Sequence, residues 1–217
     1  TVFNMVHNCP VSEDTVTIRG GNLHAADAVI DCKNSGSSIR MLAGIAAGLA
    51  GKTAFTGDDS LCKRPMLPLL SALEALGAEV EANNGCAPFS ITGPAAGDEV
   101  AIQGDISSQF ISALLLGAPL SPSGRTIRLT TELASRPYVN MTISAMKKHG
   151  VDVRETDDGF VVPAGQHYMP ADGIVSGDYS SAAFILAAGA LTGKVTVTGL
   201  EEHDPQGDKA VLDILAR

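Results

Sequence analysis

Nearly the same segment occurs three times along this chain. Each copy begins with a pair of serines and continues as an apolar run, and successive copies lie about 70 residues apart. The three pairs are Ser37-Ser38, Ser107-Ser108 and Ser180-Ser181. Repetition at a fixed period indicates a fold assembled from copies of one supersecondary unit, because each copy needs its neighbours to cover its apolar face.

The sequence around each pair predicts the order of secondary structure in one unit. The apolar run predicts a helix that ends at a turn containing glycine, and a strand-like run follows at 52–57, 125–130 and 194–199. In the first two copies an Arg-Pro dipeptide then opens a second helix, which stops near Gly77 or Gly150. Two strands come after this helix and a further strand leads to the next serine pair, at 78–83, 88–93, 99–104, 151–156, 159–164 and 173–178.

One unit therefore reads β-α-β-α-β-β, and the predicted fold class is α/β with a three-fold repeat of this unit. We expect units at approximately 22–93, 94–163 and 164–217, with the last one truncated. Residues 15–21 align with a late strand of a preceding unit, so the chain reads as a single domain, 1–217, incomplete at both ends. Three packed units could bury their helices at the centre, behind outer sheets.

A doubly wound sheet is the alternative architecture. It is disfavoured because the chain contains neither a G-x-G-x-x-G sequence after a strand nor a phosphate-binding G-x-x-x-x-G-K-[ST] loop.

Composition and charge exclude several classes of protein. The net charge of −9 argues against a nucleic-acid partner, although a local pocket on an acidic protein can still be positive. The cysteines are far apart without a C-x-x-C pair, which favours reduced thiols and a cytoplasmic location: Cys9, Cys32, Cys62 and Cys86. The histidines have no metal-ligand spacing, and the apolar runs are too short to cross a membrane, so we expect neither a metal site nor a membrane partner.

Serine is a favoured first residue of a helix, because its oxygen accepts from backbone N–H groups that have no partner within the helix. This capping role is sufficient for Ser180-Ser181, since two alanines follow. The first two copies carry additional polar groups, namely Asn34, Gly36 and Arg40 around one helix start and Gln109 at the other. Helix starts bind phosphate groups well, and glycine allows close approach of the backbone, so these two starts are candidate anion sites.

Arg64 and Arg136 precede proline at the starts of the second helices. The helix dipole disfavours a cation at this place, so helix stability gives no reason for arginine. An arginine that grips an anion with two parallel hydrogen bonds does give a reason, whereas the alternative is a solvated surface side chain. Ser135 and Tyr138 flank the second Arg-Pro dipeptide, and the tyrosine ring is either a platform for a sugar-like ring or part of the core.

Taken together, these motifs resemble the enolpyruvyl transferases, and among them the branch that uses shikimate 3-phosphate. The resemblance runs from about residue 16 to the end and is carried by NSGSSIR (34–40), KRPM (63–66), GDISSQF (104–110), SRPY (135–138), GDYSSAAF (177–184) and PQGD (205–208). It implies two similar domains of three β-α-β-α-β-β units each, of which this chain is most of the first. The implied reaction transfers the enolpyruvyl group of phosphoenolpyruvate to the 5-hydroxyl of shikimate 3-phosphate in aromatic amino acid biosynthesis, without a metal or organic cofactor.

The resemblance also implies the residues that hold the two substrates. Shikimate 3-phosphate would lie against Ser107, Ser108, Gln109, Ser135 and Tyr138. Phosphoenolpyruvate would be surrounded by Asn34, Gly36, Arg64 and Gln109, while Arg40 supports the loop. Ser37 stands where the family usually has threonine, and Arg136 where lysine is frequent, so the hydroxyl and the charge are both retained.

The family's other motif groups are absent from the chain. Neither its N-terminal Lys-Ser nor the Asp, Lys-Glu and Arg groups of its second domain are found, so we expect no catalytic residue here, and a fragment that binds without turnover. The alternatives are an enolpyruvyl transferase for UDP-N-acetylglucosamine, an RNA 3′-phosphate cyclase and a non-catalytic phosphosugar-binding module.

Overall fold

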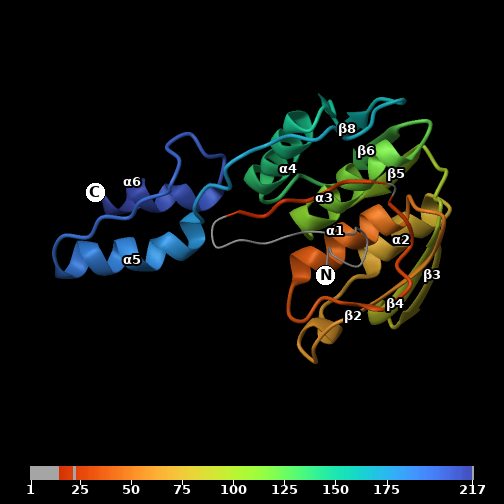
Figure 1. Ribbon diagram of the computed structural model, residues 1–217, viewed down its shortest axis with the longest axis horizontal. Helices are drawn as coiled ribbons and strands as arrows, with labels where there is room; N and C mark the ends of the chain where they lie inside the picture. Colours follow the sequence, from red (N-terminus) through yellow and green to blue (C-terminus); the bar gives the residue numbers. More distant parts are fainter. Residues whose placement is uncertain (1–14, 22, 217) are drawn as a thin grey trace.

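A computed structural model of the chain describes residues 15–21 and 23–216, with helices packed between two outer sheets (Figure 1). The first unit contains β1 (Ile30–Asp31), α1 (Gly36–Ala46), β2 (Gly51–Thr56), η2 (Leu61–Lys63), α2 (Leu67–Ala75), β3 (Glu79–Asn83) and β4 (Cys86–Gly93). The second unit contains β5 (Glu99–Ile102), α3 (Ser108–Gly117), η3 (Ala118–Leu120), β6 (Arg125–Leu129), α4 (Arg136–Lys148), β7 (Arg154–Thr156) and β8 (Gly159–Val162). The third unit contains α5 (Tyr179–Thr192), η4 (Gly207–Ala210) and α6 (Val211–Leu215).

The two sheets have the same topology. Their strand orders are β1-β2-β4-β3 and β5-β6-β8-β7. In each sheet the first two strands are parallel and the other pairs are antiparallel. The register places Ile30 opposite Phe55 and Val100 opposite Ile127, and all four side chains are buried. The predicted α/β fold class is therefore confirmed, and each sheet is built by the strands of one repeated unit.

The helix boundaries follow local sequence signals, with three corrections. The Arg64-Pro65 dipeptide does not open α2, which begins at Leu67 after η2. Gly77 and Gly150 adopt φ of 95° and 81° just past the ends of α2 and α4, a conformation that glycine tolerates without steric cost. Ser107 is the N-cap of α3, as its position predicted. The N-cap of α1 is Ser35 rather than the serine pair, and that of α5 is Asp178 rather than Ser180-Ser181. In α5 the aspartate carboxylate replaces the hydroxyl because it reaches two backbone N–H groups at once.

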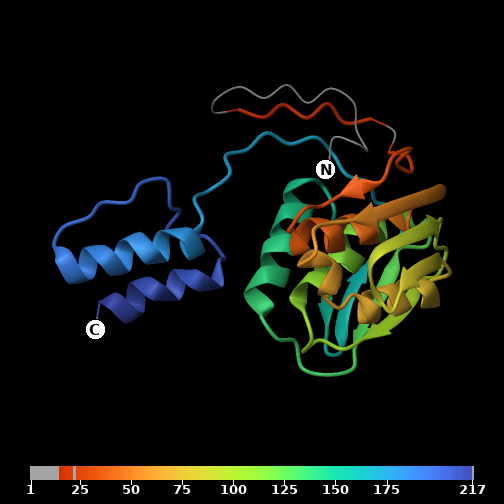
Figure 2. The ribbon, with the colours of Figure 1, turned by 90° about the horizontal axis from the view of Figure 1, so that it is seen from below.

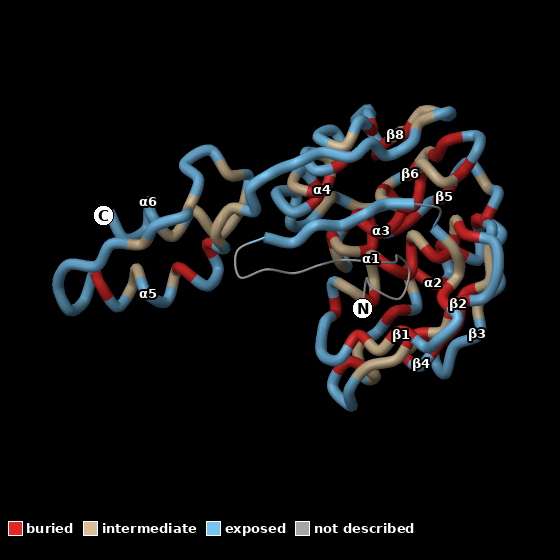
Figure 3. The backbone as a smooth tube through the Cα atoms, viewed as in Figure 1, coloured by how far each residue is buried: buried red, intermediate tan, exposed pale blue. Residues whose placement is uncertain are grey.

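Helices α1 and α3 form the centre of the core. Both are lined with buried residues (Figure 3), and they cross at Gly44 and Gly117. A Cβ on Gly44 would lie 2.0 Å from the carbonyl oxygen of Ala113, and one on Gly117 would lie 2.2 Å from the oxygen of Gly44. This contact brings the two backbones together and leaves each helix packed on the sheet of its own unit, as the views in Figures 1 and 2 show.

The third unit departs from the predicted pattern. The strands expected at 173–178 and 194–199 are absent, and the helix pair α5–α6 stands apart from the two sheets (Figure 2). Its apolar residues are correspondingly exposed, with Phe184 at 81% and Leu191 at 87%. A strand needs a neighbour for its backbone hydrogen bonds. In the other units β2 and β6 pair with the last strand of their own unit, whereas among the described residues no strand pairs with 194–199.

The strand predicted at 15–21 is also wrong in the structure. Within residues 15–21 Val16 is assigned to an isolated bridge, and no residue of the segment is assigned to a strand. Of the four cysteines, Cys9 lies outside the described residues, whereas Cys32, Cys62 and Cys86 are free thiols.

Candidate functional site

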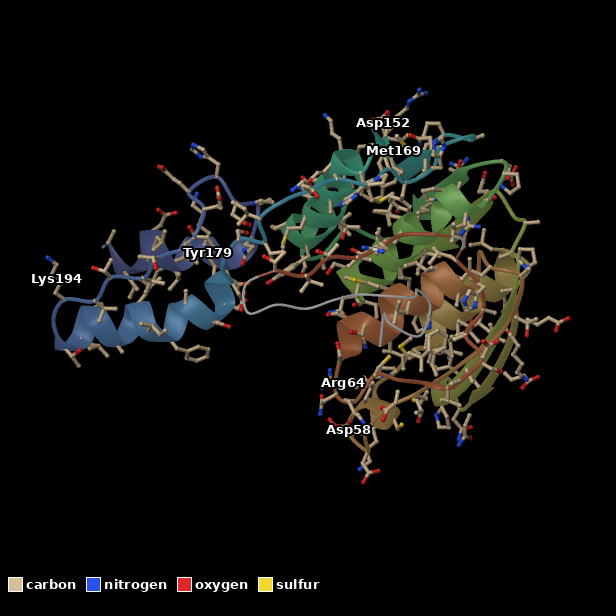
Figure 4. The ribbon with its side chains drawn as sticks, viewed as in Figure 1. Asp58, Arg64, Asp152, Met169, Tyr179 and Lys194 are labelled. Atoms are coloured by element: carbon tan, nitrogen blue, oxygen red, sulfur yellow. The ribbon has the colours of Figure 1, made fainter. Side chains whose placement is uncertain are left out.

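The candidate residues lie where parallel strands end. Because β1 and β2 are parallel, the loops that follow them meet at one edge of the sheet, an arrangement that often forms ligand sites. The backbone N–H of Asp58 donates to the carbonyl of Lys33 at 2.9 Å, and the Asn34 amide donates to the Asp58 carboxylate at 2.8 Å. Figure 4 shows Asp58 and Arg64 together at this edge.

The second unit repeats the arrangement. The hydroxyl of Thr131, after β6, accepts from the backbone N–H of Gly104, after β5, at 2.9 Å. It donates in turn to the Asp105 carboxylate at 2.7 Å. The loops that open α3 and α4 therefore lie side by side, as their counterparts in the first unit do.

The starts of α1 and α3 meet. The side-chain amide nitrogen of Gln109 donates to Ser37 Oγ at 2.9 Å, across 72 residues of sequence. Arg40 Nη1 donates to Gln109 Oε1 at 2.5 Å. The two helix starts that the sequence marked as candidate anion sites therefore lie side by side, and the surface that residues 34–40 and 107–110 form there is called the wall below.

Arg64 reaches the same wall from the end of η2. Its Nη2 donates to Asn34 Oδ1 at 2.6 Å. A Cβ on Gly36 would lie 3.0 Å from Arg64 Nη1 and 3.3 Å from Arg40 Nη1, so both guanidinium groups border this glycine. The structure thus brings together all the residues predicted to face phosphoenolpyruvate, namely Asn34, Gly36, Arg64 and Gln109.

The electrostatics of this wall are positive, although the chain is acidic. Arg40 is partly buried, and its Nε has no hydrogen-bond partner in the described part of the chain. Burial lowers the pKa of Arg40, and the neighbouring charge of Arg64 lowers it further. The guanidinium carbon of Arg40 lies 5.2 Å from the centre of the Phe110 ring, within the range of a cation–π contact. Two guanidinium groups beside each other, with the Asp58 carboxylate near Arg64 as the opposing charge, leave a positive balance that favours a bound anion.

Asp58 is the carboxylate that orients the first loop. Its pKa is lowered from 3.8, first by the hydrogen bond from the Leu61 backbone N–H and then, against desolvation, by the Asn34 amide. A group whose pKa is lower in the folded state stabilises the fold above its unfolded pKa, and this contribution disappears as the pH falls through the folded value.

We therefore predict that Asp58→Asn flattens the loss of stability on acidification. Below about pH 4 the wild-type chain loses the contribution of the ionised carboxylate, whereas the variant has none to lose. Chemical denaturation midpoints between about pH 6 and pH 2 measure the difference. Asp213→Asn, at an exposed carboxylate in α6 without a hydrogen bond among the described residues, is the matched control. Parallel curves for Asp58→Asn and wild type would contradict the prediction.

The residues predicted to hold shikimate 3-phosphate are only partly assembled. Ser107 Oγ accepts from the backbone N–H of Gln109 at 3.3 Å, and Ser108 is buried at the first turn of α3. Ser135 is exposed in the left-handed region, with φ of 54°, directly before α4. Tyr138 is exposed and donates its hydroxyl hydrogen to Asp208 of the third unit.

No hydrogen bond within the described chain joins these α4 residues to the α3 serines. A hydroxyl pair, Ser112 with Thr142 at 2.7 Å, nevertheless holds α3 and α4 side by side one turn further in.

Arg136 does not face this wall. Its guanidinium pairs with Glu155 of β7, so the interpretation that it reaches for an anion receives no support from the structure. The partner of Arg136 is this acid on the neighbouring strand.

Sequence reasoning missed several residues that shape the site. Asp58 and Thr131 hold the loops, and Asp208 accepts hydrogen bonds from Tyr138 and, at 2.8 Å, from Ser180. Gln206 accepts from the backbone N–H of Tyr179 and donates to Gly177, at 2.8 Å and 2.9 Å. The PQGD motif was the available signal for the last two, but a motif alone does not indicate which atoms its members contact.

Two further observations concern metal binding and membrane-spanning helices. Within residues 15–21 and 23–216, no group of three or more His, Cys, Asp or Glu side chains is placed to hold a metal ion. Among the same residues, no helix combines the length and apolar character needed to cross a membrane.

Fold and site together define the class: an α/β repeat protein with the fold of solved enolpyruvyl transferases, in which the first two repeated helices begin side by side. The family model of EPSP synthase (3-phosphoshikimate 1-carboxyvinyltransferase) matches residues 5–217. The chain therefore belongs to the EPSP synthase family.

Individual relatives agree with this assignment. A 3-phosphoshikimate 1-carboxyvinyltransferase of Methanocorpusculum labreanum is 61% identical over 94% of the chain and 49% of its own length. One from Methanocaldococcus jannaschii is 42% identical over 98% of the chain and 53% of its own length. A solved structure of EPSP synthase from Acinetobacter baumannii superimposes with a TM-score of 0.75 at 25% identity, over 93% of the chain and 45% of that protein. The chain thus spans about half the length of the relatives it matches.

Proposed function

We propose that the enzyme to which this chain contributes transfers the enolpyruvyl group of phosphoenolpyruvate to the 5-hydroxyl of shikimate 3-phosphate, releasing phosphate. One observation carries the proposal: the guanidinium groups of Arg64 and Arg40 both border Gly36, the first hydrogen-bonded to Asn34 and the second to Gln109. Phosphoenolpyruvate carries a phosphate and a carboxylate, and arginine binds such groups with paired, charge-assisted hydrogen bonds. Membership of the EPSP synthase family supports the same substrate.

The role of this half of the enzyme is to position the substrates. Asn34, Gly36, Arg64 and Gln109 surround the phosphoenolpyruvate anion, and Gln109 is shared with the acceptor. Ser107 and Ser108 grip the phosphate of shikimate 3-phosphate at the start of α3, while Ser135 and Tyr138 approach its ring from α4. For Tyr138 to do so, its hydroxyl exchanges Asp208 for the ligand or keeps that contact and offers its ring face.

The chain does not supply the proton transfers. General acid and base catalysis requires a titratable group within hydrogen-bond reach of the reacting atoms. The carboxylate at this wall, Asp58, is already engaged by Asn34 and Leu61. We infer that a single domain of three units, 22–93, 94–163 and 164–217, works against a second domain of the same enzyme in the cytoplasm. That second domain supplies the acid and base groups and excludes water on closure.

Titration calorimetry with shikimate 3-phosphate tests the proposal. We expect weak binding by the wild-type chain, no turnover when phosphoenolpyruvate is added, and a loss of binding in Ser107→Asp. Aspartate is as good an N-cap as serine, so the helix is retained while a negative charge faces the phosphate.

Ser71→Asp, at an exposed serine of α2, is the matched control and is expected to bind like wild type. Tighter binding of UDP-N-acetylglucosamine than of shikimate 3-phosphate would instead favour the related transferase. Equal heats for wild type and Ser107→Asp would discredit the assigned phosphate position.

A further inference from the structure

The side-chain amide of Gln109 is held in one orientation by its neighbours. A guanidinium group has only donors, so the group that faces Arg40 Nη1 at 2.5 Å is the carbonyl oxygen, Oε1. The amide nitrogen then faces Ser37 Oγ, to which it donates at 2.9 Å. The opposite orientation would place two donors against each other at the arginine.

Ser37 is the exposed end of the hydrogen-bonded series Arg40, Gln109, Ser37. Its oxygen accepts from Gln109, and its hydroxyl hydrogen goes to no acceptor in the described residues. A serine hydroxyl has one hydrogen to donate, so this hydrogen is available to a ligand. Ser37 directly follows Gly36, the residue that both guanidinium groups border, so the donor is next to the proposed anion position.

Arg40 is suited to orient the amide rather than to bind the anion. It is partly buried, its ring contact with Phe110 fixes the guanidinium plane, and its Nη1 is committed to Gln109. Hydrogen bonds in series polarise one another, so a cation at the inner end strengthens the outermost donor.

We propose that Arg40, Gln109 and Ser37 form a hydrogen-bond relay that presents the Ser37 hydroxyl as an additional donor to the anion of phosphoenolpyruvate. Arg40 is a positioning residue in this relay, and Ser37 touches the ligand. The inference rests on the proposed function, since it assigns two further residues to the same anion wall.

The binding experiment titrates phosphoenolpyruvate into chain variants at low salt. Ser37→Ala is expected to raise the Kd about tenfold, the effect of one hydrogen bond to a charged group, whereas Ser37→Thr keeps wild-type affinity because it keeps the hydroxyl. The matched control is the exposed α2 variant Ser71→Ala, which should bind as wild type does.

Arg40→Met tests the positioning role through its coupling to Ser37. The loss of affinity on Arg40→Met should be clearly smaller in a Ser37→Ala background than in wild type, because the relay then has no outer donor to orient. If the loss of affinity in the double variant equals the product of the losses in Arg40→Met and Ser37→Ala, the relay is overturned. Wild-type affinity in Ser37→Ala would overturn it as well. Arg128→Met, which removes an exposed arginine from the outer sheet, controls for the change in net charge.

A measurement on the ligand-free chain tests the hydrogen-bond relay separately from the proposed function. In the NMR spectrum of the ligand-free chain, the side-chain amide signal of Gln109 should move in both Ser37→Ala and Arg40→Met, and stay in place in Ser71→Ala and Arg128→Met. An amide signal unaffected by the first two would overturn the relay whatever the affinities. A wild-type chain that shows this coupling but binds no phosphoenolpyruvate would contradict the proposed function and the donor role of Ser37 with it.

Discussion

Arg64→Ala is expected to weaken phosphoenolpyruvate binding by about 100-fold, the largest effect of any single change at the anion wall. The guanidinium of Arg64 lies beside Gly36 and is oriented by Asn34, so its removal deletes a fork of donors and a positive charge together. Asn34 and Asp58 remain hydrogen-bonded to each other, which should leave the loop folded. Calorimetric titration at low salt measures the change, with circular dichroism to verify the fold.

Two variants decide whether geometry or charge is responsible. Arg64→Lys keeps the charge but loses the planar fork, so we expect an intermediate affinity. Arg128→Ala removes an equally positive side chain that pairs with Glu99 and Asp158 on the outer sheet, and it should leave the Kd unchanged. Equal losses in Arg64→Ala and Arg128→Ala would show that net charge alone governs binding and that this wall is not the site.

Most of the first two units could be predicted because their signals are local and occur twice. Alternating apolar residues, a glycine after each second helix and a serine before α3 specify elements whose bonding partners lie within the same unit. The register of Val80 opposite Ile91 illustrates this, since both strands follow from a short segment of sequence. Agreement between local preference and global pairing is what makes such segments predictable.

The third unit shows where local signals stop. The segment 194–199 has the same alternation as 52–57, yet it forms no strand, whereas β2 (Gly51–Thr56) pairs with β4. The alternation of apolar and polar residues indicates which face of a strand would be buried. The strand forms only where a neighbouring strand provides partners for the backbone N–H and C=O groups. Likewise α5 is as apolar as α3, but its Phe184 and Leu191 are exposed because nothing in the described chain covers them.

The same limit applies to the site. Residue types at the starts of α1 and α3 predicted two candidate anion sites, and the contact of Ser37 with Gln109 shows that these starts lie side by side. The partners of Arg136 and Tyr138 could not be predicted, because Glu155 and Asp208 come from segments whose placement depends on tertiary packing. A charged side chain pairs with an opposite charge that lies close in the folded structure. The number of residues between the two in the sequence says little about the distance between them.

Gly44→Ala is expected to destabilise the fold strongly, by about 3 kcal/mol or more, because it places a methyl group in the α1–α3 contact. The new Cβ would lie 2.0 Å from the carbonyl oxygen of Ala113, a backbone atom that no rotamer change can move. Alanine is intrinsically better than glycine in a helix by about 1 kcal/mol, so a net loss isolates the packing term. Denaturant midpoints measure it.

Gly20→Ala is the control for Gly44→Ala, because a Cβ there meets nothing within 4 Å, and its stability should stay within about 0.5 kcal/mol of wild type. The packing defect should also reach the site. Separating α1 from α3 lengthens the contact between Ser37 and Gln109, so phosphoenolpyruvate affinity should fall in conditions where Gly44→Ala is still folded. A Gly44→Ala chain as stable as wild type would mean that the two helices do not cross at this glycine, and the shared wall at their starts would lose its structural basis.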